Sequence, residues 1–216
     1  RADGVPTGFI LRLVERMAEL WLGSTSAVSF VPITDVQDAR SWLDRGDVDL
    51  LAGTWVHTRE AELEYDFSIP ILDDGVSIMS LAASSFTELD QLSGQPVGVV
   101  VGSAAEVAAP ALSQGTGLSA VGYPSFGDAL AALQSGQVVA LLTERQPALE
   151  VHFRETGFAV SDRRFTTRPM AFMLSEGDSD FRDLVSLTLM ALEAQGIYQE
   201  LYSLWFDDPV PQLQSL

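Results

Sequence analysis

Short apolar runs alternate with longer amphipathic segments along most of this chain, and this alternation restricts its fold more than any other feature. Residues 96–101 and 138–142 have the pattern of strands, and helical patterns follow them at residues 104–112 and up to residue 155. Strands that alternate with helices of about ten or more residues indicate parallel βαβ units. The sequence therefore predicts an α/β protein whose sheets are mostly parallel and flanked by helices.

The other elements follow from hydrophobic periodicity and capping signals. Residues 6–22 carry apolar side chains at three- and four-residue spacing, which indicates an amphipathic helix that ends at Gly23. Ser125 followed by Asp128 is an N-terminal cap signature. The further expected helices are 35–44, 85–92, 125–134, 180–195 and 198–206, and the further expected strands are 28–31, 48–52, 76–81, 120–122, 158–160 and 170–174.

Composition limits the size of the fold and its partners. The 216 residues suit two lobes of roughly 100 residues each, and 47% apolar residues are enough for a sizeable core. The net charge of −18 argues against nucleic acid and anionic membranes as partners, because both require clustered cations. The chain has no cysteine, which excludes disulfides and thiolate chemistry. No apolar run approaches about 18 residues, so no membrane insertion is expected.

The segment 48–80 carries the candidate ligand site. Its first strand stops at Gly53, and the polar turn that follows contains hydroxyl groups and one cation. Open α/β sheets present ligand sites at strand ends of this kind. The turn residues that we expect to contact ligand are Thr54, Val56, Thr58 and Arg59.

These residues also have purely structural explanations. Arg59 either holds a ligand or pairs with a neighbouring glutamate, and the two threonines either bind ligand or cap the turn. His57 and His152 are the only histidines and lie far apart in sequence, so we expect neither a metal nor a cofactor. The consecutive residues Asp73 and Asp74 are interpreted as cap and turn residues and not as a catalytic pair.

Several stretches, in this order and at this spacing, carry a resemblance to a known family. They are DGVPTGFILRLVERMAE, then RGDVDLLAG with HTRE, YDFS and DDGVSIM, then LSGQPVGVVVGSAAE, FGDALAALQSGQVVALLTE and GDSDFRDLVSLTLMALEAQGIYQELYSLWF. Each stretch alone is weak, because short apolar strands are common. Together they span nearly the whole chain and resemble the type II periplasmic solute-binding proteins, in the amino-acid-binding branch of ABC importers.

The resemblance implies two α/β lobes, joined by two hinge strands, that close on a ligand. Residues 1–80 and 170–216 would form one lobe and residues 81–169 the other. The implied function is capture of an amino acid or similar small polar solute for a membrane ABC permease, in the periplasm or at the cell surface, without enzyme activity. Because the chain begins with Arg1 and not with Met, we expect a processed product or a fragment.

The resemblance also implies ligand contacts in the second lobe. The carboxylate that holds the ligand's amine falls on Glu144, one methylene longer than the family's usual aspartate. The helix N-terminus that receives the ligand's carboxylate falls on Ser103 and Ala104, after Gly102. A buried ammonium requires a carboxylate partner, which explains the residue type at position 144. A structural alternative is that the helix dipole alone favours an acidic residue there.

Two departures from the family pattern concern the first lobe. An ungapped alignment puts the family's carboxylate-binding arginine at Ala61, whereas a gapped alignment pairs Thr54 with Arg59, and both alignments stay open. The family's first strand precedes its Gly-Phe segment, which in this chain is Gly8-Phe9. We therefore expect that strand to be absent from this chain or supplied by another segment or chain.

Two other functions remain open at this point. A sensory or regulatory ligand-binding domain of the same fold is favoured by the missing strand and the uncertain arginine. A cyclohexadienyl-type dehydratase would use a carboxylic acid as proton donor, and Glu144 is the candidate. No nucleophile-base pair, phosphate loop or metal cluster in the sequence supports catalysis.

Overall fold

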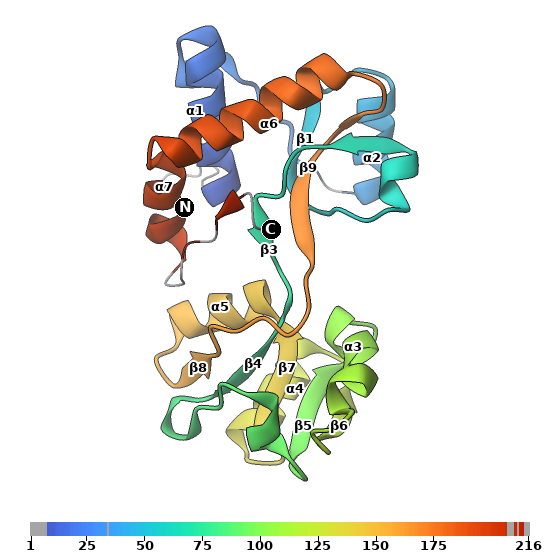
Figure 1. Cartoon of the computed structure of the whole chain (residues 1–216), viewed down its shortest axis with the longest axis vertical. Helices are drawn as coiled ribbons and strands as arrows, with labels where there is room; N and C mark the ends of the chain where they lie inside the picture. Colours follow the sequence, from blue (N-terminus) through green and yellow to red (C-terminus); the bar gives the residue numbers. More distant parts are fainter. Residues whose placement is uncertain (1–7, 34, 207–209, 211, 214–216) are drawn as a thin grey trace. The chain divides into compact units, whose positions relative to one another are not determined.

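The chain folds into two units, between which it passes twice (Figure 1). The computed structural model describes residues 8–33, 35–206, 210 and 212–213. Unit 1 contains the described residues up to Asp73 and those from Pro169 to Phe206, together with 210 and 212–213, and unit 2 is Asp74–Arg168. Each unit has its own sheet and its own buried clusters, as the two lobes of a two-domain α/β protein require.

The helices and strands divide between the two units. Unit 1 contains the helices α1 (Phe9–Leu22), α2 (Val36–Asp44), α6 (Ser179–Ala194) and α7 (Ile197–Trp205) and the strands β1 (Leu50–Val56), β2 (Tyr65–Phe67), β3 (Leu72–Asp73) and β9 (Pro169–Ser175). Unit 2 contains the strands β4 (Val76–Leu81), β5 (Pro96–Val100), β6 (Ser119–Tyr123), β7 (Ala140–Glu144) and β8 (Phe158–Val160) and the helices α3 (Ala104–Ser113), α4 (Phe126–Gln134) and α5 (Arg145–Arg154).

The sheet of unit 1 is organised on β9. This strand pairs antiparallel with β1 along one edge and with β2 and β3 along the other. Its alternate residues are buried on opposite faces: Phe172 packs with α1, α6 and α7, whereas Met173 packs with α2. Figure 1 shows the same two layers, with α2 across the sheet from the other three helices. A strand buried on both faces carries the continuous apolar run that β9 has.

The expected mostly parallel sheet is therefore wrong for unit 1, where every strand pair in the described residues is antiparallel. The strand predicted at residues 28–31 does not form either. Val28 is extended, with φ −101° and ψ 139°, yet the segment joins no ladder. Extended backbone becomes a strand only beside a partner, and within the described chain β1 pairs with β9 alone. Phe30 and Val31 consequently stay on the surface, 39% and 53% exposed.

Unit 2 has a mixed sheet in the order β6-β5-β7-β4-β8. The predicted parallel βαβ units are confirmed for β5, β6 and β7, which are parallel neighbours connected through α3 and α4. The two remaining strands are antiparallel to their neighbours. Residues 76–80, which the sequence grouped with the first lobe, pair with β7 in this sheet. The predicted helix at 85–92 is reduced to a short 3-10 turn, Leu89–Leu92.

Candidate ligand-binding site

The loop between β5 and α3 places a helix N-terminus at the end of a strand. Gly102 has φ +81°, a left-handed conformation that glycine adopts without steric cost, and it turns the chain directly into the helix. Ser103 is the N-cap residue, and its Oγ accepts a hydrogen bond from the Glu106 N–H at 3.1 Å. The sequence predicted this helix start from the same residues.

Glu144 lies at the end of β7 and precedes α5, but its side chain does not cap its own helix. Its Oε1 accepts a hydrogen bond from the Ala104 N–H at 2.8 Å, across 40 residues of sequence. The structure therefore brings Glu144, Ser103 and Ala104 together in unit 2. A second carboxylate lies at the same helix terminus, where Glu106 Oε2 accepts from the Gly102 N–H at 2.7 Å.

A buried ionic group supports the start of α5. Asp74 is 4% exposed, and it accepts from the Gln146 N–H at 2.7 Å and from Arg168 Nη1 at 2.9 Å. Burial raises the pKa of Asp74 above its usual value, and the nearby negative charge of Glu144 adds to the rise, while the Gln146 N–H and Arg168 oppose it. Asp74 thus accepts from the first turn of α5, which agrees with its interpretation as a cap residue.

Arg145 is a buried cation that the sequence analysis did not single out. It is 1% exposed, and its guanidinium donates to Ser77 Oγ at 3.2 Å and to the carbonyl oxygen of Ser161. A fully buried arginine is tolerated only when its donors are satisfied. The only local signal in the sequence is its position directly after an apolar strand, which does not distinguish it from an exposed helix-start arginine.

The turn that follows β1 in unit 1, where ligand contacts were predicted, is held by contacts of Thr58 and His57. Thr58 Oγ1 accepts from the Ala61 N–H at 3.1 Å, so this hydroxyl caps the turn. The His57 ring stacks on Phe67 with ring centroids 4.7 Å apart, and its Nε2 lies 2.7 Å from Glu62 Oε1. Glu62, one of the two glutamates near the turn arginine, is therefore engaged by the histidine.

The remaining predicted residues of unit 1 lie on the same strand and turn. Arg59 is exposed, and no hydrogen bond or ion pair is found for it in the described part of the chain. Val56 is half-buried against the unit 1 core, and Thr54 lies in β1, where its side chain is outside the described residues. Trp55 packs against the unit 1 core, and its indole N–H is buried without a hydrogen-bond partner in the described residues.

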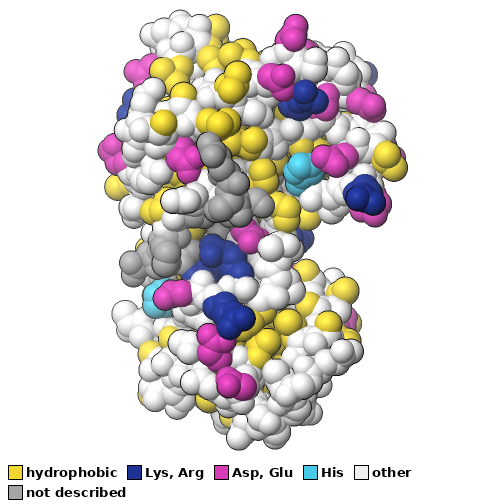
Figure 2. All heavy atoms as spheres, in the orientation of Figure 1, with side chains coloured by type: hydrophobic (Ala, Val, Ile, Leu, Met, Phe, Trp, Pro, Cys, Tyr) yellow, Lys and Arg dark blue, Asp and Glu magenta, His cyan; other side chains and the backbone are white. Residues whose placement is uncertain are grey.

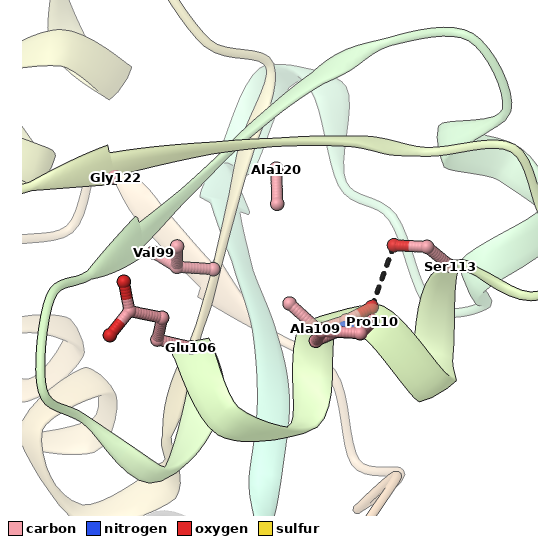
Figure 3. A pocket seen from close by; sticks show the side chains of 7 residues that line it. All are labelled: Val99, Glu106, Ala109, Pro110, Ser113, Ala120 and Gly122. Carbon is pink, nitrogen blue, oxygen red and sulfur yellow. Dashed lines mark hydrogen bonds between the residues drawn. The ribbon is translucent and has the colours of Figure 1, made fainter.

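A surface hollow of about 250 Å³ lies beside α3 (Figure 3). Glu106 is among the residues that line it, but none of the predicted ligand contacts is. Small side chains create it, because Ala120 and Gly122 on β6 leave space above Val99 and Ala109. The Ser113 hydroxyl in its wall donates to the Ala109 carbonyl at 2.6 Å. Its lining is mostly apolar and offers a zwitterion few free polar groups.

Metal binding finds no support in the described residues. They contain no group of three or more histidine, cysteine, aspartate or glutamate side chains that could hold a metal ion. The two histidines lie in different units, and His152 Nδ1 is hydrogen-bonded with the Phe158 carbonyl at 2.8 Å. None of the helices among the described residues combines the length and hydropathy needed to cross a bilayer.

Comparison with curated proteins relates the chain to amino-acid-binding proteins. It is 24% identical over 210 residues to the ABC transporter glutamine-binding protein GlnH of Bacillus subtilis, covering 96% of this chain and 76% of that protein. It is also 24% identical over 176 residues to the L-glutamate/L-aspartate-binding protein of Pseudomonas aeruginosa, covering 78% of this chain. The chain matches only 58% of the length of the latter protein.

Solved structures share the fold of this chain. The second substrate-binding domain of a putative amino acid ABC transporter from Streptococcus pneumoniae superposes with a TM-score of 0.86 at 16% identity, covering 95% of this chain and 92% of that domain. An ancestral cyclohexadienyl dehydratase superposes with a TM-score of 0.71 at 26% identity, covering 95% and 85%.

The family assignment rests on nearly the full length of the chain. Residues 1–208 match the family described as bacterial extracellular solute-binding proteins, family 3. The two-unit α/β architecture and the fold of the solved relatives agree with that match. The chain belongs to family 3 of the bacterial extracellular solute-binding proteins.

Proposed function

We propose that this chain is an extracytoplasmic solute-binding protein that captures an amino acid or similar small polar solute for an ABC transporter. The observation that carries the proposal is the meeting of Glu144 with the Ser103–Ala104 helix terminus at the ends of β7 and β5. A carboxylate beside hydroxyl and backbone groups can bind an ammonium group. The family match and the glutamine- and glutamate-binding relatives support the same ligand class.

Capture would proceed by closure of the two units on the ligand. Glu144 would hold the ligand's cationic group in unit 2, and Thr58 and Arg59 would contribute from unit 1. Contacts that exist only in the closed form give the ligand a higher affinity for that form, and this difference shifts the equilibrium. The same closure would present the loaded protein to a membrane permease, in the periplasm or at the cell surface.

Calorimetric titration of the wild-type chain with the common amino acids tests this proposal. A ligand should bind one to one and raise the melting temperature by mass action. Ser103→Ala should weaken that binding by roughly tenfold or more, because the hydroxyl oxygen that accepts a hydrogen bond from the ligand's cationic group is lost.

Ser125→Ala is the matched control, because Ser125 caps α4 through the same geometry, a 3.1 Å hydrogen bond from the Asp128 N–H. Both substitutions should cost about 1 kcal/mol of stability. Only the change at Ser103 should alter affinity. Equal affinities of the two variants for a bound solute would remove the α3 terminus from the site.

A dehydratase is the second candidate, favoured by the likeness to the ancestral cyclohexadienyl dehydratase. That reaction requires a proton donor near the leaving group, and Glu144 is the candidate among the ionisable side chains at the proposed site. Incubation with a cyclohexadienyl acid, followed by the ultraviolet absorbance of an aromatic product, distinguishes the two functions. Turnover that Glu144→Gln abolishes would support the enzyme.

A further inference from the structure

The helix terminus proposed to receive a ligand's carboxylate already carries carboxylates of the protein. Glu144 Oε1 accepts the Ala104 N–H, and Glu106 Oε2 accepts the Gly102 N–H. Between them, the Ser103 N–H donates to the Val100 carbonyl oxygen at 3.1 Å. Three consecutive backbone donors at the start of α3 therefore have partners within unit 2.

The arginines close to this terminus are also engaged. Arg145, next to Glu144 in sequence, is buried and donates to Ser77 and to the Ser161 carbonyl. Arg168 forms an ion pair with Asp74, at 2.9 Å. Neither guanidinium can turn toward a new anion without leaving a buried partner unsatisfied, which is costly. The local charge at the terminus is therefore that of Glu144 and Glu106.

A ligand carboxylate would have to displace Glu144 from Ala104 and then lie beside it. Two like charges a few ångströms apart repel each other strongly in a partly buried site. An ammonium or guanidinium group gains from the same charge, and it can bind the second oxygen of Glu144 without breaking the bond to Ala104. The arrangement that repels a ligand's anionic group thus attracts its cationic group.

We infer that Glu144 determines specificity by taking the place of a ligand carboxylate, so that the site selects small amine or guanidinium cations without an α-carboxylate. This inference rests on the proposed function and narrows its ligand class. The chain's net charge of −18 attracts the same cations over a longer range. Glu144 would remain a ligand contact, with one oxygen on the protein and the other on the ligand.

Calorimetry with paired ligands tests the inference on the wild-type protein. The pairs are L-arginine with agmatine, L-lysine with 1,5-diaminopentane and L-glutamine with 4-aminobutanamide, which differ only in the α-carboxylate. In the pair that binds, the carboxylate-free member should bind roughly tenfold tighter or more. Tighter binding of an amino acid would overturn this inference and leave the proposed function intact. If neither these paired ligands nor any other amino acid binds, both the inference and the proposed function are overturned.

Glu144→Gln tests whether the ligand preference comes from the charge of the Glu144 side chain or from its shape. The glutamine oxygen can still accept the Ala104 N–H, so the loop is retained, while the charge that repels a carboxylate is lost. The preference for the carboxylate-free ligand should shrink by roughly tenfold or reverse. Glu150→Gln removes an equal charge from α5 at a surface ion pair with Arg154 and should leave the preference unchanged. The same preference in wild type and Glu144→Gln would contradict the inference.

Discussion

The candidate ligand residues of unit 2 and those of unit 1 are held by different numbers of contacts. In unit 2, Glu144 and Ser103 are each fixed by a hydrogen bond to the start of α3, and Asp74 anchors the start of α5. In unit 1, Thr58 makes one turn hydrogen bond, and Arg59 is exposed without a partner in the described residues. Preorganised groups bind with less ordering cost, so unit 2 should set specificity and unit 1 should adapt to the ligand.

The two sheets also differ in how their strand pairing is distributed. In unit 1 every described strand pair includes β9, whereas in unit 2 pairing is shared among several strands. Hydrophobic side chains also reach the surface of unit 1, and Figure 2 shows yellow patches in its half. Phe30, Val31 and Ile33, in and next to the unpaired segment 28–31, are among the exposed hydrophobic residues. The strand pairing of unit 1 therefore depends on the single strand β9, and substitutions can test this dependence directly.

The largest effect should come from shortening the core side chain of β9. Phe172 is fully buried, and Phe172→Ala should destabilise the protein by about 3–5 kcal/mol. Because β9 joins β1, β2 and β3, hydrogen exchange should accelerate across the whole unit 1 sheet.

Leu142→Ala is the matched change in unit 2, at a fully buried position of β7. It should cost about 2–5 kcal/mol, yet the β5–β6 ladder should retain more protection than its neighbours. Retained protection of β1 and β2 in Phe172→Ala would show that the sheet of unit 1 does not depend on β9.

A smaller effect is expected where the chain enters unit 2. A Cβ atom on Gly75 would lie 1.9 Å from the Thr166 carbonyl oxygen, so the two backbones approach too closely for any side chain. Gly75→Ala should cost about 1–3 kcal/mol in urea unfolding, as overpacking of a rigid contact does. Gly157→Ala is the control, because a Cβ there meets nothing within 4 Å. Equal midpoints for the two variants would disprove the close approach.

The sequence predicted local features well and pairing poorly. The buried strand β7 and the Ser125 cap follow from apolar runs and cap residues within a few positions of each other. The antiparallel sheet of unit 1 cannot be predicted from such local patterns, because pairing with β9 joins residues more than 100 positions apart. The alternation of strands and helices supplied the parallel units, and the resemblance supplied the ligand role of the helix terminus. Neither indicated that residues 28–31 would pair with no strand among the described residues.

In the candidate site, too, the sequence indicated the residues but not the contacts between them. The sequence resemblance named Glu144 and Ser103–Ala104, and the structure brings them together. It assigned Glu144 to the ligand's amine and gave no indication that the side chain bonds to Ala104. The Asp74–Arg168 pair spans 94 residues, so no local pattern could indicate it. Such contacts depend on tertiary packing, which periodicity and spacing do not encode.

Substitution of Thr58 in the turn of unit 1 should have a small and local effect. Thr58→Val keeps the side-chain shape but removes the acceptor of the Ala61 N–H, so the cost should be about 0.5–1.5 kcal/mol. Backbone NMR relaxation should show increased motion at residues 57–64 and no increase in unit 2. Thr58→Ser retains the hydroxyl and serves as the control. An unchanged turn in Thr58→Val would show that it is as preorganised as the α3 terminus.

The smallest effect concerns the pH dependence of unit 2. Burial raises the folded-state pKa of Asp74, so the folded protein favours its protonated form more than the unfolded chain does. Its contribution to stability is therefore fully present below the usual aspartate pKa and is lost as the pH rises through the raised value. Asp74→Asn keeps an acceptor for the Gln146 N–H but cannot ionise, so its free energy of unfolding should fall less over that pH range than that of the wild type.

Urea titrations at several pH values measure this difference, and Asp162→Asn, at an exposed position, is the control. The difference should be small, because the Gln146 N–H and Arg168 both favour the ionised Asp74 and oppose the effect of burial. A wild-type protein that gains stability relative to Asp74→Asn as the pH rises would show that the Arg168 pair outweighs burial. In that case the start of α5 in unit 2 would be held mainly by charge, and the site beside it would weaken as salt screens the pair.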